Sequence, residues 1–529
     1  MVIAIVIGKG ELILICLVAV ALLALVARKI RIPYPILLTC GGVLLALIPG
    51  LPVIQLEPQL VFNLFLPPLI YPAALFTSWR DFRMNLRPIL SLAIVLVLLT
   101  MTATAFLFHG LTGLSLGIAF VFGAIMSPPD AVAALSVTQS LRVPRKIIVI
   151  LEGESLVNDA TAFIAFRFAV AAVLTGSFSL GQASLQFLLV AMGGVCVGIA
   201  IGWLATQVQK RLDDPPVQTM LSLLTPYAAY FSGEAVHVSG ILAVVIAGIY
   251  YGWRAPHVLS GRMRLQALPV WEMVVFILNG ILFILIGLQL PLVVRSLAPG
   301  SITQAAKLAI LVVLVMMLVR FAWIFGTSYL TRLLSKNVKN RTPWQHTALI
   351  AWIGMRGADS LAGALAIPFV LRSGEPFPGR DLILLLTFCV IFATLVLQGL
   401  ALTPLVRWLG VVDDHATEKE ERLARLKANE AALARLEELE SSKRVRRETV
   451  ERLRSEYEDR IRQLRIEAPD EESISRLYSR DFEELSCEML QTERDTIIAL
   501  RNEEAINDQA LRRIQRDIDL AEARLYRPS

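Results

Sequence analysis

The chain has 529 residues, of which 56% are hydrophobic and 18% are charged, and its formal net charge at pH 7 is +6. This composition is too apolar for a soluble multidomain protein and predicts a polytopic membrane protein. The basic residues lie mainly in short loops between apolar stretches and in a tail of mixed charge, so the positive balance does not indicate nucleic-acid binding. The five cysteines form no CxxC pair, and the sequence therefore indicates neither a disulfide framework nor a thiolate metal site.

Apolar stretches long enough to cross a bilayer, about 17 to 25 residues each, recur as far as residue 410. They predict about thirteen membrane-spanning helices, so we expect an all-α polytopic fold. The expected ranges are 11–27, 33–49, 59–76, 88–109, 114–139, 147–175, 182–206, 217–234, 237–253, 269–290, 304–331, 345–371 and 381–406.

Basic residues alternate along the loops between these spans. Loops after odd-numbered spans carry clusters of Lys and Arg, whereas loops after even-numbered spans carry little beyond Arg295, Arg372 and Arg380. Because positive loops stay in the cytoplasm, the pattern predicts a cell-membrane protein with its amino terminus outside and its carboxyl-terminal tail cytoplasmic.

Three carboxylates interrupt the apolar run 147–175, in the sequence LEGESLVNDAT at residues 151–161. A charged side chain at the centre of a bilayer costs about 2.5 kcal/mol or more, and such residues usually have a function. Oxygen-rich faces suit a small hard cation or a proton, although polar groups can also hold helices together. Helical spacing places four of the polar residues on one face: Glu154, Ser155, Asn158 and Asp159.

Two predicted spans contain helix-breaking sequences. The fifth holds Ser-Pro-Pro-Asp at residues 127–130, where two prolines remove backbone donors. The twelfth holds Gly-Met-Arg-Gly-Ala-Asp at residues 354–359, where paired glycines permit unwinding beside a charge. Broken helices at corresponding places in two halves indicate an inverted-repeat secondary transporter, with packing kinks as the alternative. Both breaks are expected to face the interior, towards the helix that carries Asp159.

The composition changes abruptly after Gly410, and we divide the chain into a transmembrane domain, residues 1–410, and a tail, residues 411–529. Apolar residues recur there at threes, fours and sevens among Glu, Arg and Lys, which predicts a cytoplasmic coiled coil or helical hairpin. Stabilisation of an oligomer is the expected role of this tail.

Four motifs give the chain a resemblance to the bacterial sodium/proton antiporters of the monovalent cation/proton antiporter family, relatives of the animal sodium/proton exchangers. In order, they are LPPLIY at 66–71, SPPDAVAA at 127–134, LEGESLVNDATA at 151–162, and GMRG with SLAGALAIP within 354–368. Together with the predicted spans, they cover residues 10 to 410 in the order expected for that family.

The resemblance implies a homodimer in which a core domain moves against a dimerisation domain and carries sodium past an elevator-like barrier. It implies that Asp159 is the carboxylate that binds the ion and the proton, that Asn158 and Asp130 lie beside it, and that Ser155 is an oxygen ligand for sodium. It also implies an ion pair between Glu154 and Arg356. Electrogenic relatives carry a second aspartate at the position of Asn158, so the asparagine implies exchange of one cation for one proton.

Several charged or substituted positions stand apart from this pattern. Pro72 occupies a place where many relatives have an acidic residue, and Asp359 follows GMRG where an apolar residue is expected. Three side chains are candidate accessory residues, with a structural counter-ion as the alternative for the arginines: Asp359, Arg320 and Arg167.

The chemistry follows from the cost of burying charge. Desolvation disfavours a bare carboxylate, so Asp159 is expected to hold either a proton or a dehydrated sodium ion, and only the occupied, neutral site crosses the barrier. Lithium or potassium could replace sodium, because the same oxygens serve all three ions. The expected partners are monovalent cations, protons and lipid, with no cofactor and no enzymatic activity, and the expected role is pH homeostasis.

Two functions of other classes remain alternatives. An intramembrane aspartyl protease would also need two carboxylates in the bilayer, but its YD and GxGD patterns are absent around Asp130 and Asp159. A passive cation channel would dissipate a gradient without coupling to protons.

Overall fold

The computed structural model divides the chain into two compact units, residues 1–413 and 414–529. The described elements are helices, apart from an isolated β-bridge between Val370 and Pro376. The residues that the structure describes are 9–30, 33–48, 61–130, 143–176, 180–259, 261–295, 301–334, 343–371, 373–411, 416–442, 447–466 and parts of 485–521.

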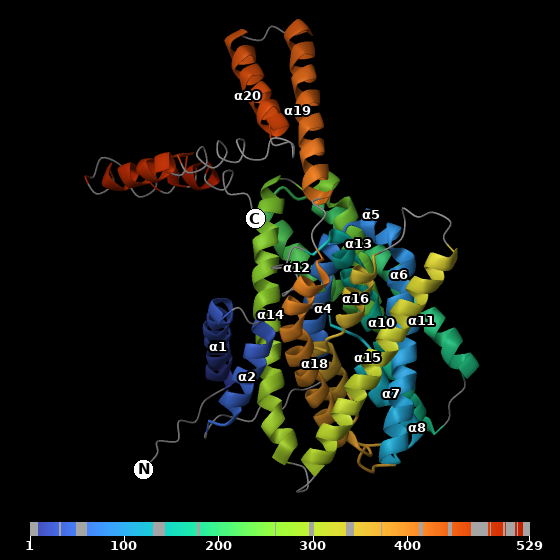
Figure 1. Cartoon of the computed structure of the whole chain (residues 1–529). Helices are drawn as coiled ribbons and strands as arrows, with labels where there is room; N and C mark the ends of the chain where they lie inside the picture. The colour runs from blue at the N-terminus through green and yellow to red at the C-terminus, as the bar shows by residue number, and fades with distance from the viewer. Residues whose placement is uncertain are drawn as a thin grey trace. The chain divides into compact units, whose positions relative to one another are not determined.

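The first unit contains eighteen described helical segments, shown in Figure 1. They are α1 (Lys9–Ile30), α2 (Tyr34–Ala46), η1 (Val61–Phe65), α4 (Leu66–Phe76), α5 (Trp79–Met84), α6 (Leu86–Leu90), η2 (Ser91–Leu96), α7 (Val97–Thr112), α8 (Leu116–Met126), α10 (Arg145–Thr175), α11 (Leu180–Gln209), α12 (Pro215–Ala235), α13 (Gly240–Val258), α14 (Gly261–Arg295), α15 (Ser301–Leu334), α16 (Trp344–Trp352), α17 (Ala358–Leu365) and α18 (Arg380–Leu409).

Every predicted span overlaps one or more of these helices. The prediction that residues 217–253 form two helices is confirmed, because α12 and α13 are separated by a tight turn in which His237 has a φ of 59°. Within the described part of the chain, seven helical stretches are long and apolar enough to cross a membrane. They begin at Leu86, Arg145, Ala183, Gly240, Met263, Thr303 and Arg380.

The predicted break in the fifth span is present. α8 ends at Met126, and residues 127–130 are not helical, because Pro128 and Pro129 have no N–H group to donate to the preceding turn. The second half of this span, residues 131–139, lies outside the described residues.

The predicted break in the twelfth span is also present. α16 ends at Trp352, residues 353–357 are not helical, and α17 begins at Ala358. The break falls at the paired glycines, as the sequence predicts. We refer to residues 127–130 and 353–357 as the two non-helical segments.

Apart from the short segments η1 and α5, the helices of the first unit form two groups, defined by their most extensive packing. We call them the α10 group and the α13 group. The α10 group contains α6, η2, α7, α8, α10, α15, α16, α17 and α18, and the α13 group contains α1, α2, α4, α11, α12, α13 and α14. Figure 1 shows α1 and α2 beside α14, in agreement with this division.

Helix α10 lies where the two groups meet. One of its faces, with Leu151 and Phe166, packs into the larger apolar core, which is built mainly from the α10 group and also includes residues of α1, α2 and α14. Its other face, with Leu156, Ala160 and Phe163, packs into a second core shared with α4 and α13. The helix runs without interruption for 31 residues and ends at Gly176, whose φ of 69° is a left-handed conformation that glycine adopts without steric cost. The polar sequence 151–161 is therefore held between the two groups.

The second unit contains α19 (Ala416–Ser442) and α20 (Arg447–Ile466), which pack against each other. Arg454 pairs with Glu440 and Arg465 pairs with Glu430, so the two helices run antiparallel. Of the two predicted tail structures, the helical hairpin matches residues 416–466. Further helical residues near Ile497, Leu511 and Ile518 form a small apolar cluster.

Candidate ion-binding site

The two non-helical segments lie against each other. The backbone N–H of Asp130 donates to the carbonyl of Met355, with an N···O distance of 2.8 Å. The side chain of Asn158 on α10 donates from Nδ2 to the carbonyl of Pro129 at 2.8 Å. These bonds satisfy backbone groups that the broken helices leave free, and they fix α10 beside both breaks.

The carboxylate of Asp130 lies against the start of α17. A Cβ atom added to Gly357 would lie 1.6 Å from Oδ2 of Asp130, so only a glycine leaves room for this close approach. The partial positive charge of a helix amino terminus favours a carboxylate in that position. The neighbouring backbone N–H of Arg356 donates to Oγ1 of Thr394 on α18 at 3.1 Å, which anchors the segment from the other side.

Asp159 is buried, with 4% of its surface exposed, and its Oδ1 has no hydrogen-bond partner among the described residues. Oδ1 of Asn158 is also buried without a partner there. Asp359 and Asp130 lie close enough to Asp159 to interact with it electrostatically. Ser155 is half-buried one turn before Asp159 on α10. Buried polar atoms are normally paired, so unpaired oxygens beside two broken helices leave acceptor positions for a cation or a proton.

The predicted ligands do not form a compact acidic cluster. Across the described part of the chain, no group of three or more His, Cys, Asp or Glu side chains is arranged to hold a metal ion. The sodium ligands predicted from the resemblance, Asp159, Asp130 and Ser155, therefore stay a prediction.

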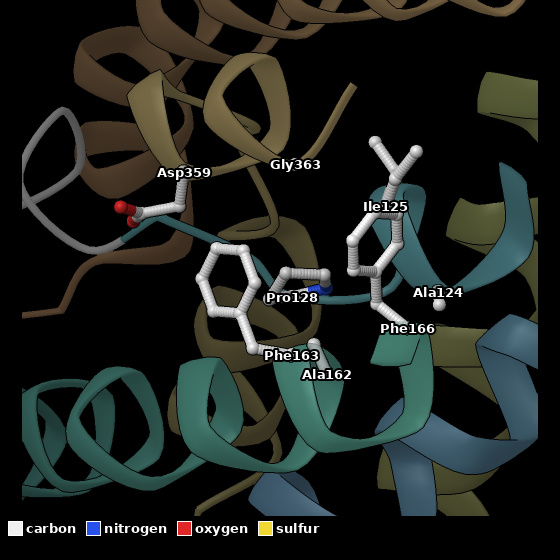
Figure 2. Close-up of a pocket in the computed structure, with 8 residues that line it drawn as sticks. All are labelled: Ala124, Ile125, Pro128, Ala162, Phe163, Phe166, Asp359 and Gly363. Carbon is white, nitrogen blue, oxygen red and sulfur yellow. The ribbon is translucent and has the colours of Figure 1, made fainter. Parts of the chain in front are cut away.

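A small pocket lies between α8, α10 and α17, with room for about one water molecule. Figure 2 shows the carboxylate of Asp359 at the edge of this pocket, turned away from Ile125 and Phe166. The pocket walls are apolar except at Asp359. The lining residues are Ala124, Ile125, Pro128, Ala162, Phe163, Phe166, Asp359 and Gly363.

Glu154 has a different partner from the one that the resemblance implies. Its two carboxylate oxygens accept from Nη1 and Nη2 of Arg320 on α15, at 2.5 and 2.9 Å. Arg320 also donates from Nε and Nη2 to the carbonyl of Ile350 at the end of α16. The predicted Glu154–Arg356 pair is thus replaced by a Glu154–Arg320 pair, because α15 brings its arginine face to face with the carboxylate in bidentate geometry.

Arg356 is buried close to this pair. It interacts electrostatically with both members, repelled by Arg320 and attracted by Glu154. Its Nε and Nη1 have no hydrogen-bond partner within the described ranges. The backbone bond between Asp130 and Met355, rather than the side chain of Arg356, joins the two breaks directly.

The other candidate accessory arginine lies away from the broken helices. Arg167 on α10 donates from Nη2 to both carboxylate oxygens of Glu234 on α12, at 2.7 and 2.8 Å. Pro72 is buried inside α4, which packs against α13. The structure therefore brings Asp159, Asn158 and Asp130 together but leaves Arg167 in a separate contact.

Three contacts of the candidate residues and their neighbours were not predicted from the sequence. They involve Thr394 as the acceptor for Arg356 N–H, Gly357 as the residue that admits Asp130, and Glu234 as the partner of Arg167. An acidic residue at the end of a predicted span was a signal for Glu234, but its partner depends on how α10 and α12 are placed in space.

Comparison with known proteins decides the family. A family model described as the transmembrane sodium/hydrogen exchanger matches residues 15–408. The chain belongs to the sodium/hydrogen exchanger family. The resemblance predicted from the four motifs is confirmed, and the exchanger is a multi-pass membrane transporter of the class that exchanges cations for protons.

Relatives of the exchanger cover most of its length. A Mycobacterium bovis protein described as an uncharacterized Na(+)/H(+) exchanger is 34% identical over 537 residues, which span 99% of this chain and 98% of that relative. A Bacillus pumilus protein named a sodium, potassium, lithium and rubidium/H(+) antiporter is 36% identical over 410 residues, which span 74% of this chain and 61% of that relative.

The fold also resembles a solved structure. The sodium proton antiporter of Methanocaldococcus jannaschii superposes with a TM-score of 0.62 at 18% identity, over 75% of this chain and 97% of that one. At this identity the likeness supports the all-helical antiporter fold. Family membership favours a transporter over the protease and passive-channel alternatives.

Proposed function

We propose that the exchanger moves one sodium or lithium ion against one proton, and that Asp159 binds each in turn. The observation that supports this most directly is the buried Asp159 carboxyl, with Oδ1 unpartnered among the described residues, beside two broken helices. Asp130, Ser155 and Asn158 complete the proposed binding site.

The cost of burying a charge would couple the two fluxes. A carboxylate that holds a proton or a cation is neutral as a unit, whereas the bare carboxylate carries a large desolvation penalty in a low-dielectric interior. An empty site is therefore held back, and only an occupied site moves. Carbonyl oxygens freed at residues 127–130 would supply further ligands for a dehydrated cation without adding a second titrating group.

The two helix groups give this cycle a physical basis. We propose that the α10 group is the part that moves and that the α13 group remains fixed and forms a homodimer. We also propose thirteen spans in inverted repeats, an amino terminus outside the cell membrane, and a cytoplasmic tail that stabilises the dimer. The first 410 residues would form the transport domain, and the helical hairpin would belong to the tail.

Asn158 is the basis for the proposed stoichiometry. Its amide donates to the carbonyl of Pro129 and carries no charge, so Asp159 is the titrating member of this Asn-Asp pair. Exchange of one cation for one proton is electroneutral. A potassium diffusion potential set with valinomycin is then expected to leave the exchange rate unchanged.

A broader selectivity is the second candidate. The Bacillus pumilus relative is named for sodium, potassium, lithium and rubidium, and it is 36% identical to this chain. The same oxygen ligands serve all four alkali ions, so the relative supports a potassium/proton exchange at the same site.

The test is cation-induced dequenching of a pH-sensitive dye in proteoliposomes, with sodium, lithium and potassium in turn. We expect a sodium response in the wild type that Asp159→Asn abolishes, because a neutral amide neither takes up a proton nor balances the charge of a bound cation. Asp213→Asn, at an exposed loop position, is the matched control and should retain the response. Undiminished exchange in Asp159→Asn would overturn the proposal, and an equal potassium response would favour the second candidate.

A further inference from the structure

Arg167 and Glu234 form an ion pair that connects the two helix groups. Arg167 belongs to α10, and Glu234 belongs to α12 in the α13 group. Both oxygens of Glu234 accept from the same guanidinium nitrogen, and both side chains are partly exposed. The helices α10 and α12 each pack against α13, and this ion pair spans from one to the other.

The backbone of Glu234 is anchored at the end of α12, in the α13 group. Glu234 lies one residue before the end of α12, and the turn that follows is fixed by backbone bonds from His237 to Glu234 and from Val238 to Gly233. A Cβ atom added to Gly240, the first residue of α13, would lie 3.0 Å from Oε1 of Glu234. The carboxylate therefore lies at the amino terminus of α13, where the helix dipole favours a negative charge.

Arg167 is carried by the same helix as the proposed ion-binding carboxylate. It lies eight residues after Asp159, or about 12 Å along the axis at 1.5 Å per residue. α10 is continuous between the two positions, so any displacement of Asp159 with its helix also displaces Arg167. A short contact to both oxygens of a fixed carboxylate is lost after a small displacement.

We propose that the Arg167–Glu234 ion pair is a latch that holds the α10 group against the α13 group in the conformation described here. The inference rests on the proposed function, in which the α10 group moves during exchange. The latch opens each time the group leaves this position, and breaking it contributes to the barrier for that step. The ion pair therefore affects the rate of exchange without contacting the transported ions.

A double-mutant cycle tests the latch in the full-length exchanger, with Arg167→Gln, Glu234→Gln and the double variant in proteoliposomes. Each single change is expected to raise the maximal sodium/proton exchange rate about two- to five-fold, the range for breaking a half-exposed pair, and leave the apparent sodium affinity unchanged. The double variant should be no faster than either single one, because one contact is lost in all three. Arg435→Gln, in an exposed pair within α19, is the matched control with an unchanged rate.

The outcomes separate the latch from the proposed function. Single variants with unchanged or lowered exchange rates overturn the latch, and so does a double variant in which the two single increases multiply. Exchange that is abolished by Asp159→Asn supports the proposed function in either case. Absence of coupled exchange in the wild type overturns the proposed function itself.

Cross-linking gives a second, independent test. Cysteines at positions 167 and 234, in a chain whose native cysteines are replaced by alanine and which retains exchange, are joined by a bifunctional thiol reagent with a reducible spacer. Exchange should stop on cross-linking and return on reduction, while either single cysteine treated in the same way stays active. A fully cross-linked protein that exchanges at the untreated rate would contradict the latch.

Discussion

Two of the arginine–carboxylate contacts that helix α10 makes lie in contrasting surroundings. The pair between Glu154 and Arg320 is almost completely buried, with 2% and 6% of the two side chains exposed. The pair between Glu234 and Arg167 is partly open, with 31% and 51% exposed. In each pair both carboxylate oxygens accept hydrogen bonds, so the difference lies in burial and in which helices are joined.

The buried pair stays within one helix group, whereas the exposed pair joins two. Glu154, Arg320 and Ile350 belong to α10, α15 and α16, all in the α10 group. Separating two buried charges costs several kcal/mol, about 3 to 5, so such a pair suits helices that move as a unit. A half-exposed pair contributes about 0 to 1 kcal/mol and is rehydrated when it opens, which suits a contact that breaks and reforms.

The largest expected effect comes from breaking the buried pair. Glu154→Ala leaves the Arg320 guanidinium buried without its counter-charge, and we expect the free energy of unfolding to fall by about 3 to 5 kcal/mol. Thermal unfolding in detergent measures the loss, with Glu152→Ala on the same helix as the control. The double variant Glu154→Ala/Arg320→Met should recover much of the stability. A loss below about 1 kcal/mol for Glu154→Ala would mean that the buried pair contributes no more to stability than the exposed pair does.

A smaller loss of stability is expected when residue 320 keeps its positive charge but loses the planar guanidinium group. Arg320→Lys keeps the charge but loses the planar guanidinium whose separate N–H groups bond both oxygens of Glu154 and the carbonyl of Ile350, so it should cost about 1.5 to 3 kcal/mol. The same unfolding measurement applies. Stability equal to the wild type would mean that charge alone, without the bidentate geometry, accounts for the buried pair.

Arg356 sharpens the comparison because it is buried near Glu154 but does not bond to it. Arg356→Met removes a buried charge whose Nε and Nη1 are unpartnered among the described residues, and the change in stability should be about 1 kcal/mol or less. Parallel unfolding of Arg356→Met and Glu154→Ala is the measurement. Equal losses would support the Glu154–Arg356 pair that the resemblance implies.

The smallest effect on stability is expected at the exposed pair. Arg167→Gln should change the free energy of unfolding by about 0 to 1 kcal/mol, and the change should shrink at 1 M salt, where charges are screened within about 3 Å. Unfolding at low and high salt, compared with Arg435→Gln in α19, checks this. A salt-independent loss of several kcal/mol would mean that the contact is a fixed structural tie.

The two breaks could be predicted from the sequence because their causes are local. Pro128 and Pro129 cannot donate to a preceding turn, and paired glycines flank Arg356, so both segments leave the helix wherever the rest of the chain lies. The partner of Glu154 could not be predicted in the same way. Arg320 and Arg356 are both buried near it, and the choice depends on the position of α15 relative to α10.

The sequence by itself determined the apolar helices, the two interruptions, the polar face of α10 and the family, because each is encoded by residue type and spacing along the chain. Only the tertiary structure decided that Asp130 lies against Gly357, that Glu154 faces Arg320, and that Arg167 reaches Glu234. These contacts join residues far apart in the chain, and helix packing sets which charges meet, because hydrophobic burial fixes the positions of the helices and has no direction of its own.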